Sequence, residues 1–254
     1  MIEFNRVSKR FGNKIVLDNI SFDINKGETF VIIGLSGAGK TTILRHIAGF
    51  VDPDSGEILI DNIKMNNSTH RVKAVLRKKM GFLFQSGALI NWLSIRDNVA
   101  LSLTELKMGS KKEINRIVNE KLELLQLGDA GDKMPSEVSG GMKKRAGLAR
   151  AIVHNPDIIL YDEPTSGLDP VMSSMISELI IQMQCKLGAT SVVVTHDIES
   201  AYHIADRIAM LYNGEILECG TPDEIKGSAN PVVQQFINGE ITGPIIDGQK
   251  NYYI

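Results

Sequence analysis

The feature that most constrains this chain is a glycine-rich segment, Gly34-Leu35-Ser36-Gly37-Ala38-Gly39-Lys40-Thr41-Thr42. It follows Thr29 to Ile33, a compact apolar run typical of a buried parallel strand, and precedes a helical pattern. In the motif G-x-x-x-x-G-K-[ST], the glycines turn backbone N–H groups toward phosphate oxygens, and the following helix adds its positive dipole end. The flanking strand and helix argue against a turn that only caps a helix. The segment therefore predicts a cradle for the phosphates of ATP, with contacts from Gly34, Ser36, Gly37, Ala38, Gly39, Lys40, Thr41 and Thr42.

Within this cradle two side chains carry specific chemistry. Lys40 is placed to contact the β- and γ-phosphates, and the hydroxyl of Thr41 is placed to bind Mg²⁺.

A second chemical feature is an apolar strand pattern, Ile158 to Tyr161, that ends in the adjacent carboxylates Asp162 and Glu163. A buried strand has no need of two acids at its end unless a cation or a reaction uses them. Such a pair can also be a solvated strand end, but the phosphate cradle favours a catalytic reading. Asp162 is then a partner for Mg²⁺, and Glu163 is the general base that polarises the attacking water.

A third feature is Ser139-Gly140-Gly141-Met142, which precedes a helical pattern over 143–155. A serine followed by two glycines at a helix start can bind an anion, although a simple N-cap gives the same pattern. Since the chain already has one phosphate cradle, Ser139 and Gly141 suggest contacts to a second nucleotide.

The rest of the sequence alternates short β-rich runs with helical stretches, which is typical of a parallel sheet covered by helices. Strands are expected within 2–24, with a turn at 11–13, and at 29–33, 56–60, 80–84, 157–160, 191–195 and 207–212. Asn213-Gly214 then predicts a hairpin to 215–218. Between about 89 and 150 the β pattern is replaced by helical spacing, which predicts an inserted helical lobe. A short helix follows Pro222, and the segment from Asn230 onward is rich in Gly, Pro and polar residues.

Composition excludes some partners. The net charge of −2, with Lys and Arg spread along the chain, argues against nucleic acid. No apolar run is long enough to span a bilayer, and Met1 to Phe4 does not resemble the start of a signal peptide. We expect a cytoplasmic protein that could still dock onto a membrane protein.

Taken together, these motifs resemble the nucleotide-binding subunit of ATP-binding-cassette (ABC) transporters, in the order that this family shows. Val138 to Met142 is similar to the family signature, and Asp162 to Pro170 matches the stretch that leads into the D-loop. The resemblance covers about 2–226. It implies an α/β fold, with a P-loop NTPase (RecA-like) core, a mostly parallel sheet, an antiparallel β subdomain and a helical subdomain at about 89–150. Residues 227–254 would be a C-terminal tail.

The resemblance also assigns roles to single residues. Gln85 fits the Q-loop glutamine, which senses Mg²⁺ or the lytic water, and His196 fits the switch histidine at the γ-phosphate. Phe11 has the place of an aromatic residue stacked on adenine, and Asp169 would act across a dimer interface. Each has a plainer alternative: a core position for Phe11, a structural role for His196, and turn chemistry for Asp169.

Two departures from the family pattern concern the signature. Val138 replaces the usual leucine and Met142 the usual glutamine, which methionine cannot match in hydrogen bonding. Ser139 and Gly141 keep the phosphate-facing features.

The family implies that two such chains close head-to-tail around ATP and move an integral-membrane permease, with a docking surface around Gly87 to Val99.

A narrower resemblance is to the ATPases of Mla-type phospholipid transporters. It rests on Leu83 to Leu89, on Ser139 to Arg145, and on Gln235 to Gly239 followed by Gly243-Pro244-Ile245. This group implies transport of phospholipid between inner and outer membranes, with the ATPase on the cytoplasmic face of the inner membrane. Its partners would be the permease, a periplasmic MCE lipid-binding protein and a small accessory cytoplasmic subunit.

Alternatives remain for function and for the tail. One is an importer of polar solutes such as amino acids, and another is an ABC ATPase outside transport. The tail is either a solvated, partly disordered terminus or an arm that reaches the partner subunit, with Tyr252, Tyr253 and Ile254 as anchors.

Overall fold

Two sheets organise the chain, and the computed structural model describes them within residues 1–250. The smaller sheet is antiparallel, in the order β2-β1-β4-β5, with β1 (Ile2–Phe11), β2 (Lys14–Ile24), β4 (Ser55–Ile60) and β5 (Ile63–Lys64). The larger sheet has the order β10-β9-β3-β8-β7-β6, with β3 (Thr29–Ile33), β6 (Met80–Leu83), β7 (Ile158–Asp162), β8 (Thr190–Thr195), β9 (Arg207–Tyr212) and β10 (Glu215–Gly220). Only the β9–β10 pair of this sheet is antiparallel. The predicted α/β fold is confirmed.

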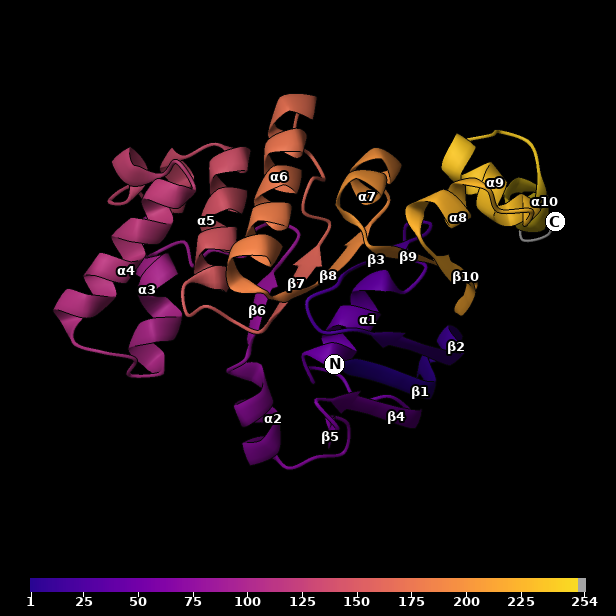
Figure 1. Cartoon of the computed structure of the whole chain (residues 1–254), viewed down its shortest axis with the longest axis horizontal. Helices are drawn as coiled ribbons and strands as arrows, with labels where there is room; N and C mark the ends of the chain where they lie inside the picture. The colour runs from indigo at the N-terminus through magenta and orange to yellow at the C-terminus, as the bar shows by residue number, and fades with distance from the viewer. Residues whose placement is uncertain (251–254) are drawn as a thin grey trace.

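Strand β3 connects two hydrophobic cores because its side chains alternate between the faces of the larger sheet. Phe30 and Ile32 face the core shared with the antiparallel sheet, whereas Val31 and Ile33 face the core under the other helices. Helix α1 (Lys40–Ile47) lies between the two sheets, where it buries Ile43, Leu44 and Ile47. Figure 1 shows α1 in this position. The segment 34–39 is therefore fixed at its start by the buried strand β3 and at its end by the buried helix α1.

The inserted lobe is helical, as the spacing predicts, and lies at one end of the molecule (Figure 1). It contains α3 (Ile95–Glu105), α4 (Lys111–Leu124), 3-10 helices at Gly128–Ala130 and Pro135–Glu137, and α5 (Gly140–Ile152). Ser110 and Glu113 form a capping box that starts α4. The short helix α2 (His70–Arg77) and strand β5 had no clear sequence signal.

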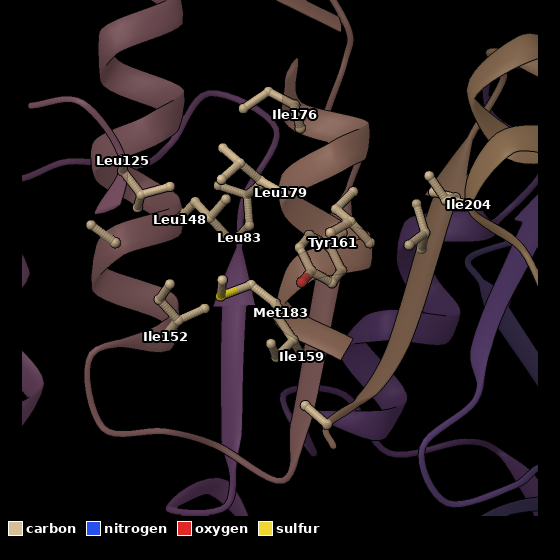
Figure 2. Packing of buried hydrophobic residues seen from close by; sticks show 14 of the residues in the cluster. Leu83, Leu125, Leu148, Ile152, Ile159, Tyr161, Ile176, Leu179, Met183 and Ile204 are labelled. Carbon is tan, nitrogen blue, oxygen red and sulfur yellow. The ribbon is translucent and has the colours of Figure 1, made fainter. Parts of the chain in front are cut away.

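Helix α5 packs tightly on the sheet, together with α6 (Pro170–Leu187) and near α7 (Ile198–Ile204). Figure 2 shows Leu148 and Ile152 of α5 facing Leu83 of β6 and Met183 of α6. A Cβ atom on Gly147 would lie 2.9 Å from Cα of Gly87, so α5 also approaches the loop after β6 closely. The position of α5 is thus set by the core.

The C-terminal segment forms α8 (Pro222–Lys226), α9 (Pro231–Asn238) and α10 (Pro244–Lys250). The buried amide of Gln235 accepts a hydrogen bond from the N–H of Ile245 at 2.7 Å and donates one to the carbonyl of Glu240 at 3.1 Å. The segment is helical up to residue 250, and these bonds connect the start of α10 to α9. The proposed anchors Tyr252, Tyr253 and Ile254 lie outside the described residues. The division at 226/227 and the role as an arm stay predictions.

Candidate active site

The glycine-rich segment forms the connection between β3 and α1, as the sequence predicts. Gly34 has φ +151°, and a Cβ there would lie 2.2 Å from the carbonyl oxygen of Leu211. Gly39 has φ +107° as the N-cap of α1, and a Cβ there would lie 2.9 Å from the carbonyl oxygen of Val16. A side chain at either position would force the loop away from the body. Glycine at these two positions therefore lets the loop lie close to the backbone at Leu211 and Val16.

Lys40 lies at the centre of this loop, with only 6% of its surface exposed. Its Nζ donates to the carbonyls of Gly34 at 2.8 Å and Leu35 at 3.1 Å, and lies 3.5 Å from Oε1 of Glu163. Burial lowers the pKa of Lys40, and the neighbouring Glu163 carboxylate opposes that shift. The ammonium is already positioned at the mouth of the loop, where phosphate oxygens can replace the loop carbonyls.

Thr41 and Asp162 meet although they are far apart in sequence. Oγ1 of Thr41 donates to Oδ1 of Asp162 at 2.8 Å, at the carboxyl end of β7. Burial raises the pKa of Asp162, and the bond from Thr41 works against that increase. A hydroxyl and a carboxylate oxygen are ligands of the kind that Mg²⁺ prefers.

The donor set also fits a cation that arrives with its ligand. Among residues 1–250, no cluster of three or more His, Cys, Asp and Glu side chains is suited to hold a metal ion. Mg²⁺ commonly uses one or two protein oxygens together with water and phosphates. The pair Thr41–Asp162 fits that mode of binding.

The carboxylate of Glu163 is oriented by contacts with Thr195 and His196 at the end of β8. Its Oε2 lies 2.8 Å from Nδ1 of His196 and accepts hydrogen bonds from the His196 N–H and the Thr195 hydroxyl, both at 3.3 Å. Its backbone is left-handed, with φ +50°, and its N–H donates to the carbonyl of Val194 at 2.9 Å. The carboxylate is thus held between His196 on one side and Lys40 on the other.

Lys40, Thr41 and Glu163 line a cavity of about 390 Å³, together with Gln85 from the loop that follows β6. Phe11 lies at its rim and is 49% exposed, so the alternative of a core position is wrong. The lining comprises Phe11, Val16, Ser36, Gly37, Gly39, Lys40, Thr41, Thr42, Gln85 and Glu163. Four other predicted site residues are not part of the lining: Gly34, Ala38, Asp162 and His196.

Ser139, Gly141 and Asp169 do not belong to this cavity. Ser139 caps α5 and accepts from the N–H of Met142 at 3.3 Å, while Asp169 caps α6 and accepts from the N–H of Met172 at 3.0 Å. A Cβ on Gly141 would contact Met172 at 3.4 Å and Leu168 at 3.7 Å. The signature and the segment around Asp169 therefore adjoin each other, away from the cavity of their own chain.

Sequence reasoning missed one residue beside the site, Lys144. Its Nζ donates to the carbonyls of Glu163 at 3.0 Å and Pro164 at 3.1 Å, and to that of Ser166. The available signal was a lysine on the same face of α5 as Gly147, Leu148 and Ala151, which are all buried.

Comparison with known proteins decides the family. Residues 17–166, more than half of the chain, match the ABC transporter family. The chain belongs to the ABC transporter ATP-binding family. The chain is therefore an ABC ATPase, a class of enzyme that binds and hydrolyses ATP.

Relatives and solved structures extend this result. The chain is 41% identical over 244 residues to the "Probable ribonucleotide transport ATP-binding protein mkl" of Mycobacterium leprae, covering 96% of this chain and 70% of the relative. It is 40% identical over 245 residues to the intermembrane phospholipid transport system ATP-binding protein MlaF of Haemophilus influenzae and of Escherichia coli K12, covering 96% of this chain and 93% and 91% of those proteins.

Among structures of ABC ATPases, a dimeric post-hydrolysis state of the cassette MJ0796 with ADP and phosphate matches with a TM-score of 0.82 at 35% identity. The match covers 87% of this chain and 99% of that one. CbiO1 from Clostridium perfringens matches with a TM-score of 0.81 at 30% identity, covering 89% and 90%.

Proposed function

We propose that this ABC ATPase powers the transport of phospholipid between the inner and outer membranes of a double-membraned cell. The observation that carries the proposal is the similarity to MlaF, because it extends over 96% of this chain and more than nine tenths of the relative. It includes the C-terminal helices as well as the ATPase motifs, which many transporters of unrelated cargo share.

Within the cavity, we assign the chemistry as follows. Lys40 and the loop N–H groups hold the phosphates, and Phe11 stacks on adenine. Thr41, Asp162 and Gln85 would hold Mg²⁺, which when bound neutralises phosphate charge and orients the β- and γ-phosphates. Glu163 accepts the proton of the attacking water, and His196 orients Glu163 and contacts the γ-phosphate.

A second copy of the chain completes the site in this proposal. Ser139, Gly141 and Asp169 lie outside the lining of their own chain's cavity, and Gly141 adjoins Leu168 and Met172, which flank Asp169 in the chain, as expected of groups that act on a partner's nucleotide. The matched dimeric structures of MJ0796 support a dimer. We propose a head-to-tail arrangement in which each signature faces the partner's phosphate loop.

The transmembrane part belongs to other chains in this proposal. In residues 1–250 no helix has the length and apolar character needed to cross a bilayer. Trp92, in the loop between Gln85 and α3, is 78% exposed. A groove of about 490 Å³ is lined by apolar residues of β6 and α3, including Met80, Phe82 and Leu101, and also by charged residues such as Arg77 and Glu105. We propose that a permease docks on this surface and holds the ATPase at the cytoplasmic face of the inner membrane.

The resemblance to Mla-type transporters implies two further components, which we include in the proposal. A periplasmic MCE lipid-binding protein and a small accessory cytoplasmic subunit would complete the system, as in Mla-type transporters.

Docking of the permease can be measured directly. The chain contains one tryptophan, so its fluorescence reports on Trp92 alone. We expect a blue shift of the Trp92 emission when the detergent-solubilised permease is added, measured as the difference between the spectra of the wild-type and Trp92→Phe mixtures. An unchanged spectrum on a complex that forms by size exclusion would contradict docking at this surface.

The cargo is tested by purifying the chain with its co-expressed membrane partners and identifying bound lipids by mass spectrometry. We expect phospholipid above the level of a matched preparation without the MCE protein. ATPase activity stimulated by a polar solute, with no bound phospholipid, would contradict the proposal.

One observation favours a second candidate, transport of a polar solute. The relatives named for ribonucleotide transport are as similar as MlaF, at 41% identity, although they are longer than this chain. Stimulation of the ATPase by ribonucleotides, tested beside amino acids and phospholipid vesicles, distinguishes the two candidates. The third alternative, an ABC ATPase outside transport, predicts no complex with a permease.

A further inference from the structure

Helix α5 carries three cationic side chains that hold the backbone carbonyls of three different loops. Lys144 holds the loop after β7, Arg145 holds the carbonyls of Leu125 and Gln126, and Arg150 holds those of Gly87 and Ala88. Two of these loops contain site residues, Glu163 and Gln85. The loop held by Arg145 contains none.

The contact of Lys144 is a buried one. The residue is only 6% exposed, and its Nζ donates to the carbonyls of Glu163 at 3.0 Å, Pro164 at 3.1 Å and Ser166. A buried ammonium is costly unless its donors are satisfied, and here three carbonyls provide for all three N–H groups. Burial lowers the pKa of Lys144, and the Glu163 carboxylate partly opposes that shift.

The backbone that Lys144 holds is strained. Glu163 has φ +50°, a left-handed conformation that a residue with a Cβ adopts only when its surroundings impose it. On one side, the Glu163 N–H is bound to Val194 of β8. On the other side, its carbonyl is bound by Lys144. The peptide groups flanking Glu163 are thus both fixed, and the direction of its carboxylate depends on them.

We propose that Lys144 is a positioning residue for ATP hydrolysis, which holds the Glu163 backbone so that the carboxylate points into the site. This inference rests on the proposed role of Glu163 as the general base. Lys144 stands on the same helix as Ser139, which caps its first turn. Helix α5, whose first turn would contact the partner's nucleotide, is therefore hydrogen-bonded to Glu163, the proposed base for the nucleotide of its own chain. A shift of α5 on closure of the dimer reaches Glu163 through the bond of Lys144 to its carbonyl, and reaches the rest of that loop through the bonds to Pro164 and Ser166.

The test is steady-state and single-turnover ATPase activity of the full chain in complex with its permease. Lys144→Met keeps the length of the side chain and removes its donors. We expect kcat to fall at least about tenfold while KM for ATP stays within about twofold, because phosphate contacts are untouched. Lys144→Arg keeps the charge and several donors, and should recover most of the lost kcat.

Two further variants make the result specific. Arg145→Met removes a cation on the same helix whose carbonyl partners lie outside the site, and it should retain wild-type kcat. Glu163→Gln tests the base itself: if it hydrolyses ATP at the wild-type rate, the proposed role of Glu163 fails, whatever Lys144→Met does.

The inference on Lys144 is overturned by any of three results. These are a wild-type kcat in Lys144→Met, an equal loss in Arg145→Met, or a Lys144→Arg variant that binds ATP normally but recovers nothing. If Lys144→Met does not fold, the comparison of Lys144→Arg with Lys144→Gln decides in the same way, since only arginine keeps the cation.

Discussion

Nδ1 of His196 lies 2.8 Å from Oε2 of Glu163, and the backbone N–H of His196 donates to the same oxygen at 3.3 Å. The two residues directly follow neighbouring strands, β8 and β7, and each was expected at the site for a separate reason. Their contact means that the histidine controls the direction of the carboxylate as well as any contact it makes to phosphate.

Replacing this histidine should impair hydrolysis more than binding. We expect His196→Ala to lower kcat about a hundredfold, since general-base catalysis requires a positioned base, and to change ATP affinity little. His203→Ala is a matched control, because His203 forms an exposed pair with Glu178 at 2.7 Å on α7. Equal losses in the two variants, measured by phosphate release, would contradict the assignment.

Lys40→Ala should weaken nucleotide binding. Lys40 is the buried cation at the phosphate loop, and a charge-assisted bond contributes about 1.5–3 kcal/mol, so we expect the Kd for ATP to rise at least tenfold. Lys79→Ala, which breaks only the exposed pair with Asp61, serves as control. Titration with a fluorescent ATP analogue measures both. An unchanged Kd in Lys40→Ala would contradict the phosphate-binding role.

Asp162→Asn should stabilise the nucleotide-free protein. Burial raises the pKa of Asp162 above its ordinary value of 3.8, so the folded state binds more protons than the unfolded state in the window above 3.8. Stability therefore falls as pH rises through that window and stays lower at neutral pH. We expect a Tm about 2–4 °C higher than wild type at pH 7, with the difference shrinking toward pH 4.

At Asp54 we expect the opposite pH dependence of stability. Its pKa is lowered mainly by its hydrogen bonds from Lys9 and the Arg10 N–H, so its contribution is present at neutral pH and lost in acid. Asp54→Asn should lose stability at pH 7 and match wild type in acid. Circular dichroism melts at several pH values separate the two.

Asp162→Asn should also lose the extra stabilisation by Mg²⁺ with ATP. A wild-type increase in Tm on adding Mg²⁺ and ATP would contradict the role of Asp162 as a ligand.

Ser139→Ala should affect hydrolysis beyond its effect as a lost helix cap. The cap bond to Met142 contributes about 1 kcal/mol, a loss that Ser110→Ala on α4 should reproduce. We expect only Ser139→Ala to lower kcat, with ATP binding to the single chain unchanged in both. If binding and hydrolysis fall together in Ser139→Ala, the contact to a partner's nucleotide is refuted.

The C-terminal segment is tested by two deletions. Removing 251–254 keeps the bond between Gln235 and Ile245, whereas removing 243–254 deletes α10 as well. If the segment is an arm to the partner, dimerisation in the presence of ATP should decrease in both, by analytical ultracentrifugation. Unchanged dimerisation and ATPase activity in both deletions would leave α10 as a structural element of its own chain.

Much of the architecture follows from local patterns. The apolar runs at 29–33, 191–195 and 207–212 predict buried strands, because parallel strands covered on both faces need apolar side chains throughout. Short elements such as β5 and α2 escaped prediction, since their few residues carry no distinct periodicity. The polar composition after Asn230 suggested partial disorder, but Val233 of α9 packs into the core and the buried amide of Gln235 bonds α9 to α10.

By itself, the sequence predicted which groups meet phosphate, because Gly34, Gly39, Lys40 and Thr41 lie within eight consecutive residues and the required backbone conformation is local. The tertiary structure alone decided what faces them. Thr41 meets Asp162, and Glu163 lies between Lys40 and His196, because β3, β7 and β8 end at the same edge of one parallel sheet. The contact of Lys144 with the Glu163 backbone also depends on how α5 packs on that sheet, and no local pattern encodes such long-range packing.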